Sequence, residues 1–160
     1  MRVLDILSAD RVSVANPSEG LVRSKSEALV RLATLLARGQ DVLSAEVIER
    51  VLHDRERLQS TGVGGGVAIP HGAIDRVERI IGAVLLCPDG IEFDAIDSAP
   101  VTILVAVIGP KRATGEHLKT LARVSRLLRD DSFRTRLLAS TDGRSAFELI
   151  AHEESQTTQP

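Results

Sequence analysis

The chain has 160 residues, 43% of them hydrophobic and 26% charged, which is typical of one soluble globular domain with its own buried core. Its 20 basic and 22 acidic residues give a formal net charge of −2, which argues against nucleic-acid or membrane-surface partners. Three phenylalanines and no tyrosine or tryptophan leave few aromatic platforms on which nucleic-acid bases or sugars could stack. A single cysteine, Cys87, excludes an internal disulfide and favours a reducing compartment.

The N-terminus has none of the features of a targeting segment. Its first seven residues are interrupted by charges at Arg2 and Asp5, and they include no long hydrophobic stretch. The longest unbroken apolar run, residues 103–108, is far shorter than the roughly 20 residues that a membrane-spanning helix needs. We therefore expect a cytoplasmic protein without membrane insertion.

Two helices are predicted in the first part of the chain. Residues 24–27 read Ser-Lys-Ser-Glu, a capping box that precedes apolar residues at helical spacing, and Gly39 supplies the stop. A second helix is predicted from about Ser44, and it should end before the glycine-rich stretch 62–66.

Two strands are predicted in the middle of the chain. Residues 79–87 and 101–108 are short runs rich in β-branched side chains, and turn signals at 88–90 and 109–110 follow them. Apolar runs that are nearly continuous over this length are typical of strands buried on both faces.

The remaining elements complete a prediction of the fold. A third helix is expected from about Glu116, shorter helices near 132–139 and 145–150, and a polar, disordered tail over 151–160. Helices on either side of buried strands, with no long linker or internal repeat, predict a single α/β domain over residues 1–150. We expect a central mixed β-sheet flanked by helices on both faces.

Residues 55–72 are the segment most informative about function, and several familiar sites are excluded there. No lysine lies between Lys25 and Lys111, so the glycines do not form a Walker phosphate loop. Their spacing does not fit a dinucleotide-binding fingerprint, and a G-x-S-x-G nucleophile elbow occurs nowhere. One cysteine and four scattered histidines give no zinc-ligand spacing. We therefore expect neither a metal nor a cofactor.

His71 is the principal candidate for chemistry. It lies between Pro70 and Gly72, which restrain the backbone on one side and permit a close approach on the other. Neutral imidazole is a nucleophile near neutral pH, and the backbone N–H groups of the glycines at 62–66 could turn toward an anion. The alternative is a loop glycine cluster beside a structural histidine, and the spacing alone leaves both interpretations open.

The segment resembles the active-site motif of type 2 enzyme IIA domains, the mannitol, fructose and nitrogen-regulatory class of the bacterial phosphotransferase system. That motif runs from Arg-Glu through Thr-Gly-x-Gly to Ala-x-Pro-His-Gly, and the chain presents it in order as Arg55, Glu56, Thr61, Gly62, Gly64, Ala68, Pro70, His71 and Gly72. The resemblance extends from about residue 4 to residue 150. It implies that His71 accepts a phosphoryl group from phosphohistidine on an HPr-like carrier protein, with Arg55 near the phosphorylated ring.

The resemblance also implies a second histidine beside the first. His117, in Gly-Glu-His-Leu at 115–118, matches the family's histidine at the start of the helix after the last long strand. The first turn of a helix favours an anion, although a solvated polar residue is the simpler interpretation of such a position.

Further phosphate-loop candidates are Thr61, Gly62, Gly64 and Gly66, and loop capping is the alternative for the Thr61 hydroxyl. Many relatives carry a polar residue at the position of Gly65, so one contact near the phosphate is expected to be missing.

The sequence of residues 93–101 resembles the nitrogen-regulatory branch of this family more than its sugar branches. We therefore expect a phosphocarrier that acts as a regulatory sensor of phosphorylation state, with regulatory proteins as targets. Two alternatives stay open: a sugar-specific IIA component that passes phosphate to a separate IIB during fructose- or mannitol-type uptake, and an interaction module that no longer transfers phosphate.

A local excess of positive charge lies in the C-terminal part of the chain. Residues 111–136 contain eight basic and three acidic side chains, and Lys119, Arg123 and Arg126 share helical spacing. A solvated helix face is the ordinary explanation. A docking surface for an acidic partner is the alternative.

Overall fold

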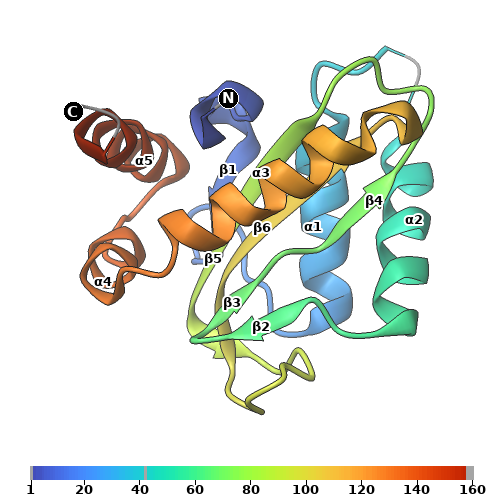
Figure 1. Ribbon diagram of the computed structural model, residues 1–160. Coiled ribbons are helices and arrows are strands. Elements are labelled where there is room, and N and C mark those ends of the chain that lie inside the picture. The colour runs from blue at the N-terminus through green and yellow to red at the C-terminus, as the bar shows by residue number, and fades with distance from the viewer. Residues whose placement is uncertain (1, 42, 158–160) are drawn as a thin grey trace.

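A six-stranded mixed β-sheet forms the centre of the computed structural model, which describes residues 2–41 and 43–157. Helices α1 (Lys25–Ala37) and α2 (Ala45–Leu58) cover one face of the sheet. Helices α3 (Thr114–Leu127), α4 (Asp131–Leu138) and α5 (Gly143–Thr157) lie on the other side (Figure 1). This arrangement confirms the α/β fold with a mixed sheet and helices on both faces.

The sheet is organised around its longest two strands, β5 (Ile81–Ile91) and β6 (Val101–Gly109), which pair antiparallel. The strand order is β1-β5-β6-β3-β2, and β4 also pairs with β6, farther along that strand. β1 runs parallel to β5, whereas β3 and β4 both run parallel to β6. The four short strands are β1 (Val12–Val14), β2 (Gly62–Gly64), β3 (Val67–Ala68) and β4 (His71–Ala73).

Two apolar layers, one on each face of the sheet, hold the fold together. Along β5, Ala83 and Leu85 face α1 and α2, whereas the alternate residues Val84 and Leu86 face α3, α4 and α5. Side chains alternate between the two faces of a strand, and both faces of this strand are covered by helices. This double burial explains the continuous apolar runs in the sequence. None of the helices within residues 2–41 and 43–157 has both the length and the apolar character needed to cross a bilayer.

The first two helices begin where the capping signals predicted. The hydroxyl of Ser24 accepts the backbone N–H of Glu27 at 3.1 Å, and the hydroxyl of Ser44 accepts that of Val47 at 3.3 Å. Each serine satisfies an N–H group that has no partner inside its helix. Three short 3₁₀ helices, η1 (Val3–Ile6), η2 (Ala9–Arg11) and η3 (Lys111–Ala113), complete the structure.

The structure differs from the sequence prediction at residues 88–90. The turn expected there lies inside β5, which continues to Ile91. The pairing with β6 is irregular between Leu86 and Ile91, and Gly90 has a φ of +78°. An irregularity of this kind bends a strand without ending it, so Pro-Asp-Gly here marks a bulge-like break in register.

The structure also differs from the expected tail at 151–160, because α5 continues through Thr157. Glu154 is only 3% exposed, and its carboxylate accepts the backbone N–H groups of Val3 at 2.8 Å and Leu4 at 2.6 Å. This polar residue therefore holds η1 against α5, a long-range role that its local sequence does not reveal. Residues 158–160 lie outside the described residues.

Candidate functional site

His71 is the first residue of β4 and pairs with Val107 of β6. Its ring is partly exposed, and Nδ1 lies 2.8 Å from the carbonyl oxygen of Ile69. Because a carbonyl oxygen can only accept a hydrogen bond, Nδ1 carries the proton in the neutral ring. The lone pair is therefore on Nε2, and this tautomer leaves His71 with a nucleophilic nitrogen in a fixed orientation.

His117, in the first turn of α3, lies beside His71. The two ring centroids are 5.8 Å apart, and the ring planes meet at 65°. His117 is 9% exposed, and its Nε2 is buried without a hydrogen-bond partner among the described residues. Burial, followed by the nearby charge of His71, lowers the pKa of His117 below its usual 6.5, so its ring is neutral at pH 7. An unpartnered buried nitrogen beside a nucleophile indicates a place for a ligand atom.

Arg55 lies in the last turn of α2. Its Nη1 donates to the carbonyl oxygen of Gln59 at 2.9 Å. Two residues farther on, the carbonyl oxygen of Thr61 accepts the N–H of Ile69 at 3.0 Å. The chain that follows α2 therefore lies alongside the segment that leads into β4. Arg55 donates to Gln59, the first residue after α2.

Glu56, a residue of the motif to which the sequence assigned no role, is the centre of a buried polar network. It is 8% exposed, and its carboxylate accepts both the N–H of Thr61, at 3.1 Å, and the Thr61 hydroxyl. The ammonium of Lys25, at the start of α1, lies 3.1 Å away. Glu56 thus joins both helices to the chain entering β2, and it occupies the Thr61 hydroxyl that was a candidate phosphate contact.

The turn between β2 and β3 contains three glycines with positive φ, Gly64 (+97°), Gly65 (+66°) and Gly66 (+80°). These are backbone conformations that other residues adopt at a cost. The N–H of Gly65 donates to the Asp97 carboxylate at 3.0 Å, which holds the turn against the β5–β6 connection and lowers the Asp97 pKa.

The structure does not bring the glycine turn to His71. Along β6, Val67 pairs with Ile103, whereas His71 pairs with Val107. Four residues of strand separate these positions by about 13 Å. Gly62 lies at the start of β2, where a Cβ would come within 2.8 Å of Ala95. The space that the absent Gly62 side chain leaves is thus taken by Ala95 of the same protein and not by a ligand.

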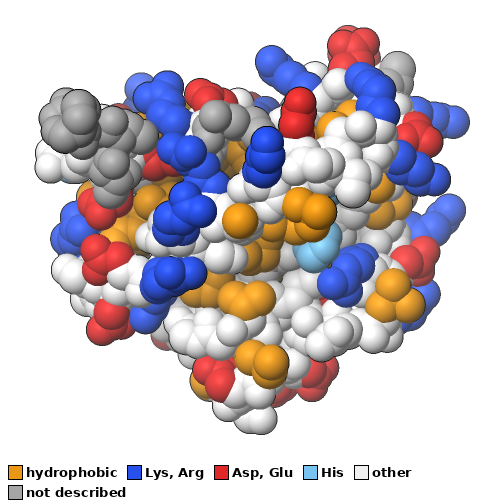
Figure 2. Space-filling model, in the orientation of Figure 1, with side chains coloured by type: hydrophobic (Ala, Val, Ile, Leu, Met, Phe, Trp, Pro, Cys, Tyr) orange, Lys and Arg blue, Asp and Glu red, His pale blue; other side chains and the backbone are white. Residues whose placement is uncertain are grey.

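Two exposed leucines lie in α3 and α2. Leu118 directly follows His117 and is 63% exposed, and Leu58 in the last turn of α2 is 82% exposed. Figure 2 shows hydrophobic side chains next to the histidine visible on that face, with a basic side chain beside it. An exposed leucine next to a reactive group, such as Leu118, is typical of a surface used by another protein.

Cys87 is buried, and desolvation raises the pKa of its thiol to about 12, so it stays protonated. Among the described residues, no group of three His, Cys, Asp or Glu side chains is placed to hold a metal ion.

The sequence of the chain is similar to those of a known protein family. The sequence profile of the family described as phosphoenolpyruvate-dependent sugar phosphotransferase system, EIIA 2, matches residues 7–153. A nitrogen regulatory protein of Bradyrhizobium diazoefficiens is 39% identical over 130 residues, which cover 81% of this chain and 84% of that protein.

Solved structures are also similar. The nitrogen regulatory protein IIA-Ntr of Neisseria meningitidis has a TM-score of 0.82 at 31% identity, covering 92% of this chain and 98% of that one. The mannitol IIA in a complex with phosphorylated mannitol IIB from Escherichia coli has a TM-score of 0.73 at 23% identity, covering 91% and 97%, and shares the fold.

Proposed function

The chain belongs to the type 2 enzyme IIA family of the phosphoenolpyruvate-dependent phosphotransferase system, and we propose that it carries a phosphoryl group on Nε2 of His71. Family membership and the nitrogen regulatory relatives support a phosphotransfer or regulatory role in that system. The observation that carries the proposal is the histidine pair, in which the Nδ1 of His71 is tied to a carbonyl and His117 presents an unpartnered buried nitrogen.

The proposed reaction is an in-line transfer between two imidazoles. The lone pair on Nε2 of His71 attacks the phosphorus of a phosphohistidine on an HPr-like carrier protein. A new P–N bond forms as the donor's P–N bond breaks, and the bonding electrons return to the donor nitrogen. The hydrogen bond from Nδ1 to the Ile69 carbonyl stabilises the positive charge that develops on the His71 ring.

Three groups are candidates for stabilising the transferred phosphoryl group. Neutral His117 can place a proton on Nε2 and donate it to a phosphoryl oxygen, which supplies the missing partner. The N-terminus of α3 favours negative charge at the same place. The family resemblance puts Arg55 near the phosphorylated ring, and its guanidinium, which now donates to the Gln59 carbonyl, can donate to a phosphoryl oxygen instead.

The phosphorylated state differs from the free state in its surface charge, and a partner can bind the two states with different affinity. A phosphoryl group adds close to two negative charges at a site bordered by the exposed Leu118.

The likeness to nitrogen regulatory proteins supports a regulatory sensor in the cytoplasm. The solved complex of a mannitol IIA with phosphorylated IIB supports the second candidate, transfer to a IIB domain during sugar uptake. An interaction module without transfer is the third outcome that the experiment below separates.

The test is phosphorylation of the purified chain by phosphoenolpyruvate, the general phosphotransferase enzyme and an HPr-like carrier, followed by intact-mass measurement. The expected product carries one acid-labile phosphoryl group, and His71→Ala carries none. His152→Ala, which removes an exposed histidine on α5, is the matched control and should react normally.

An unmodified natural chain would refute the transfer proposal and leave the interaction module. A modified His71→Ala would refute the assignment of the acceptor. Passage of the label to a sugar-specific IIB would favour transport over regulation.

A further inference from the structure

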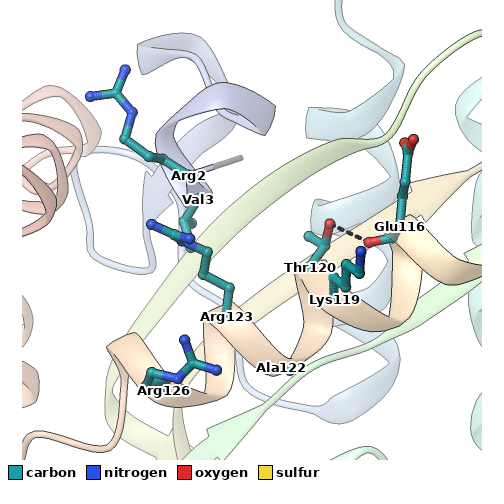
Figure 3. Close-up of a pocket in the computed structure, with 8 residues that line it drawn as sticks. All are labelled: Arg2, Val3, Glu116, Lys119, Thr120, Ala122, Arg123 and Arg126. Carbon is teal, nitrogen blue, oxygen red and sulfur yellow. Dashed lines mark hydrogen bonds between the residues drawn. The ribbon is translucent and has the colours of Figure 1, made fainter. Parts of the chain in front are cut away.

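A groove of about 520 Å³ lies between the start of η1 and the adjoining side of α3 (Figure 3). Its basic side chains come from both walls, Arg2 from the first and Lys119, Arg123 and Arg126 from the second. Val3 and Ala122 add an apolar contribution. Figure 2 shows Lys and Arg side chains gathered over α3 on the same face. The groove is thus a hollow with several separated positive charges.

The charges in the groove are only partly balanced. Arg2 pairs with Asp5 at 3.5 Å, and Arg123 lies 3.9 Å from the buried carboxylate of Glu154. Lys119 and Arg126 have no carboxylate within ion-pair distance among residues 2–41 and 43–157. The groove therefore has an excess of positive charge available to a partner.

The one acidic side chain that lines the groove does not cancel this excess. Glu116 lies at one end of the row, and its carboxylate points away from Arg123 and Arg126 (Figure 3). Its backbone carbonyl accepts the hydroxyl of Thr120 at 2.8 Å, which helps to fix the wall at that end.

The spacing of the cations indicates an elongated occupant. Lys119, Arg123 and Arg126 are at positions i, i+4 and i+7 of α3. Residues three or four apart on a helix are separated by about 5–6 Å, and seven residues span about 10 Å along the axis. Carboxylates at the same helical spacing on a second helix can pair with the three cations one by one. The exposed Ala122 can contact a short apolar side chain between those carboxylates.

The groove is separate from the histidine pair on α3. His117 lies on the buried side of this helix, whereas Lys119 and Arg126 are exposed. Neither His71 nor His117 is among the residues that line the groove, so a partner there contacts other side chains than the histidine pair.

We propose that the groove docks an acidic amphipathic helix of a partner protein, with its Glu or Asp side chains facing Lys119, Arg123 and Arg126. The attraction is electrostatic, so the affinity falls as ionic strength rises. This proposal is independent of phosphoryl transfer at His71.

The test titrates the full chain with a fluorescein-labelled helical peptide that carries Glu at i, i+4 and i+7 and alanine between them. A second peptide with Gln at the three positions is the matched probe. The variant is Lys119→Glu/Arg126→Glu, which leaves the Arg123–Glu154 pair intact. The control is Arg50→Glu/Arg144→Glu, which reverses two charges outside the groove. Circular dichroism verifies that both double variants are folded.

At low salt, the Glu peptide is expected to bind the natural chain and the control with equal affinity, and the Lys119→Glu/Arg126→Glu variant at least tenfold more weakly. The Gln peptide should also bind at least tenfold more weakly. Saturable binding that is absent, or that is equal in the two double variants, would overturn the proposal. So would displacement of the peptide by a single-stranded oligonucleotide at lower concentration than by the unlabelled peptide, since the groove would then favour nucleic acid. Phosphorylation of His71 should be unchanged in the groove variant, so this test and the previous one fail separately.

Discussion

Replacing Glu56 with alanine should destabilise the fold by about 4 kcal/mol, because two buried donors lose a charged acceptor. The N–H of Thr61 and its hydroxyl both donate to this carboxylate. A hydrogen bond to a charged group contributes roughly 1.5–3 kcal/mol. The Lys25 pair, whose ammonium side chain is 23% exposed, adds at most about 1 kcal/mol after screening by solvent. Water that enters the truncated site can hydrogen-bond to the two donors, which reduces the total loss of stability to about 4 kcal/mol.

The assay is urea unfolding followed by circular dichroism, with two reference variants. Glu56→Gln keeps an oxygen acceptor for Thr61 and should cost only about 1–2 kcal/mol. Glu49→Ala, on the same helix, removes a partly exposed carboxylate that lies 3.7 Å from His53 and should cost under about 0.5 kcal/mol. A domain with about 5–15 kcal/mol of stability would survive the alanine substitution.

A loss below about 1 kcal/mol for Glu56→Ala would refute the reasoning, since the buried donors would then have found other partners at little cost. A loss equal to that of Glu56→Gln would show that charge, and not the two hydrogen bonds, accounts for the effect.

Three further predictions follow from single positions. Gly72→Ala places a Cβ against Val51 of α2 and should cost about 1–3 kcal/mol by urea unfolding, while the double variant with Val51→Ala should recover most of it; no recovery would contradict the contact. Cys87, whose thiol pKa is raised to about 12, should not react with iodoacetamide in the folded chain at pH 8 and should react once unfolded; rapid labelling of the folded chain would contradict its burial. The pKa of His117 is lower in the folded chain than the usual 6.5, so its contribution to stability is complete above pH 6.5 and is lost as the pH falls below that value. Urea unfolding between pH 8 and pH 5 should therefore show a smaller decline for His117→Gln than for the natural chain, and equal declines would contradict the shift.

Local sequence patterns were sufficient where the deciding contacts are local. Ser24 and Ser44 cap helices through N–H groups three residues away, so their signals are visible in any short window. The apolar run of β6 reflects burial on both faces, which side-chain character alone indicates. The Pro-His-Gly motif marked His71 because its neighbours in the chain restrict the same backbone that presents the ring.

Contacts outside the local segment were the source of the differences. The expected tail became part of α5 because Glu154 binds the backbone of Val3 and Leu4, at the other end of the chain. The expected turn at 88–90 became part of β5 because β6 continues to pair with that strand as far as Ile91. In both cases a contact with another element outweighed a local preference for turn or coil.

The sequence by itself determined the fold class, the family resemblance and the identity of the histidine pair as candidates, because these depend on periodicity and on residue type. Only the tertiary structure decided which candidates meet. His71 and His117 are 117 − 71 = 46 positions apart, and they become neighbours because β4 pairs in parallel with the end of β6, after which α3 begins. The same pairing places the glycine turn four residues down β6 from His71, since a strand extends the chain by about 3.3 Å per residue and does not fold it back.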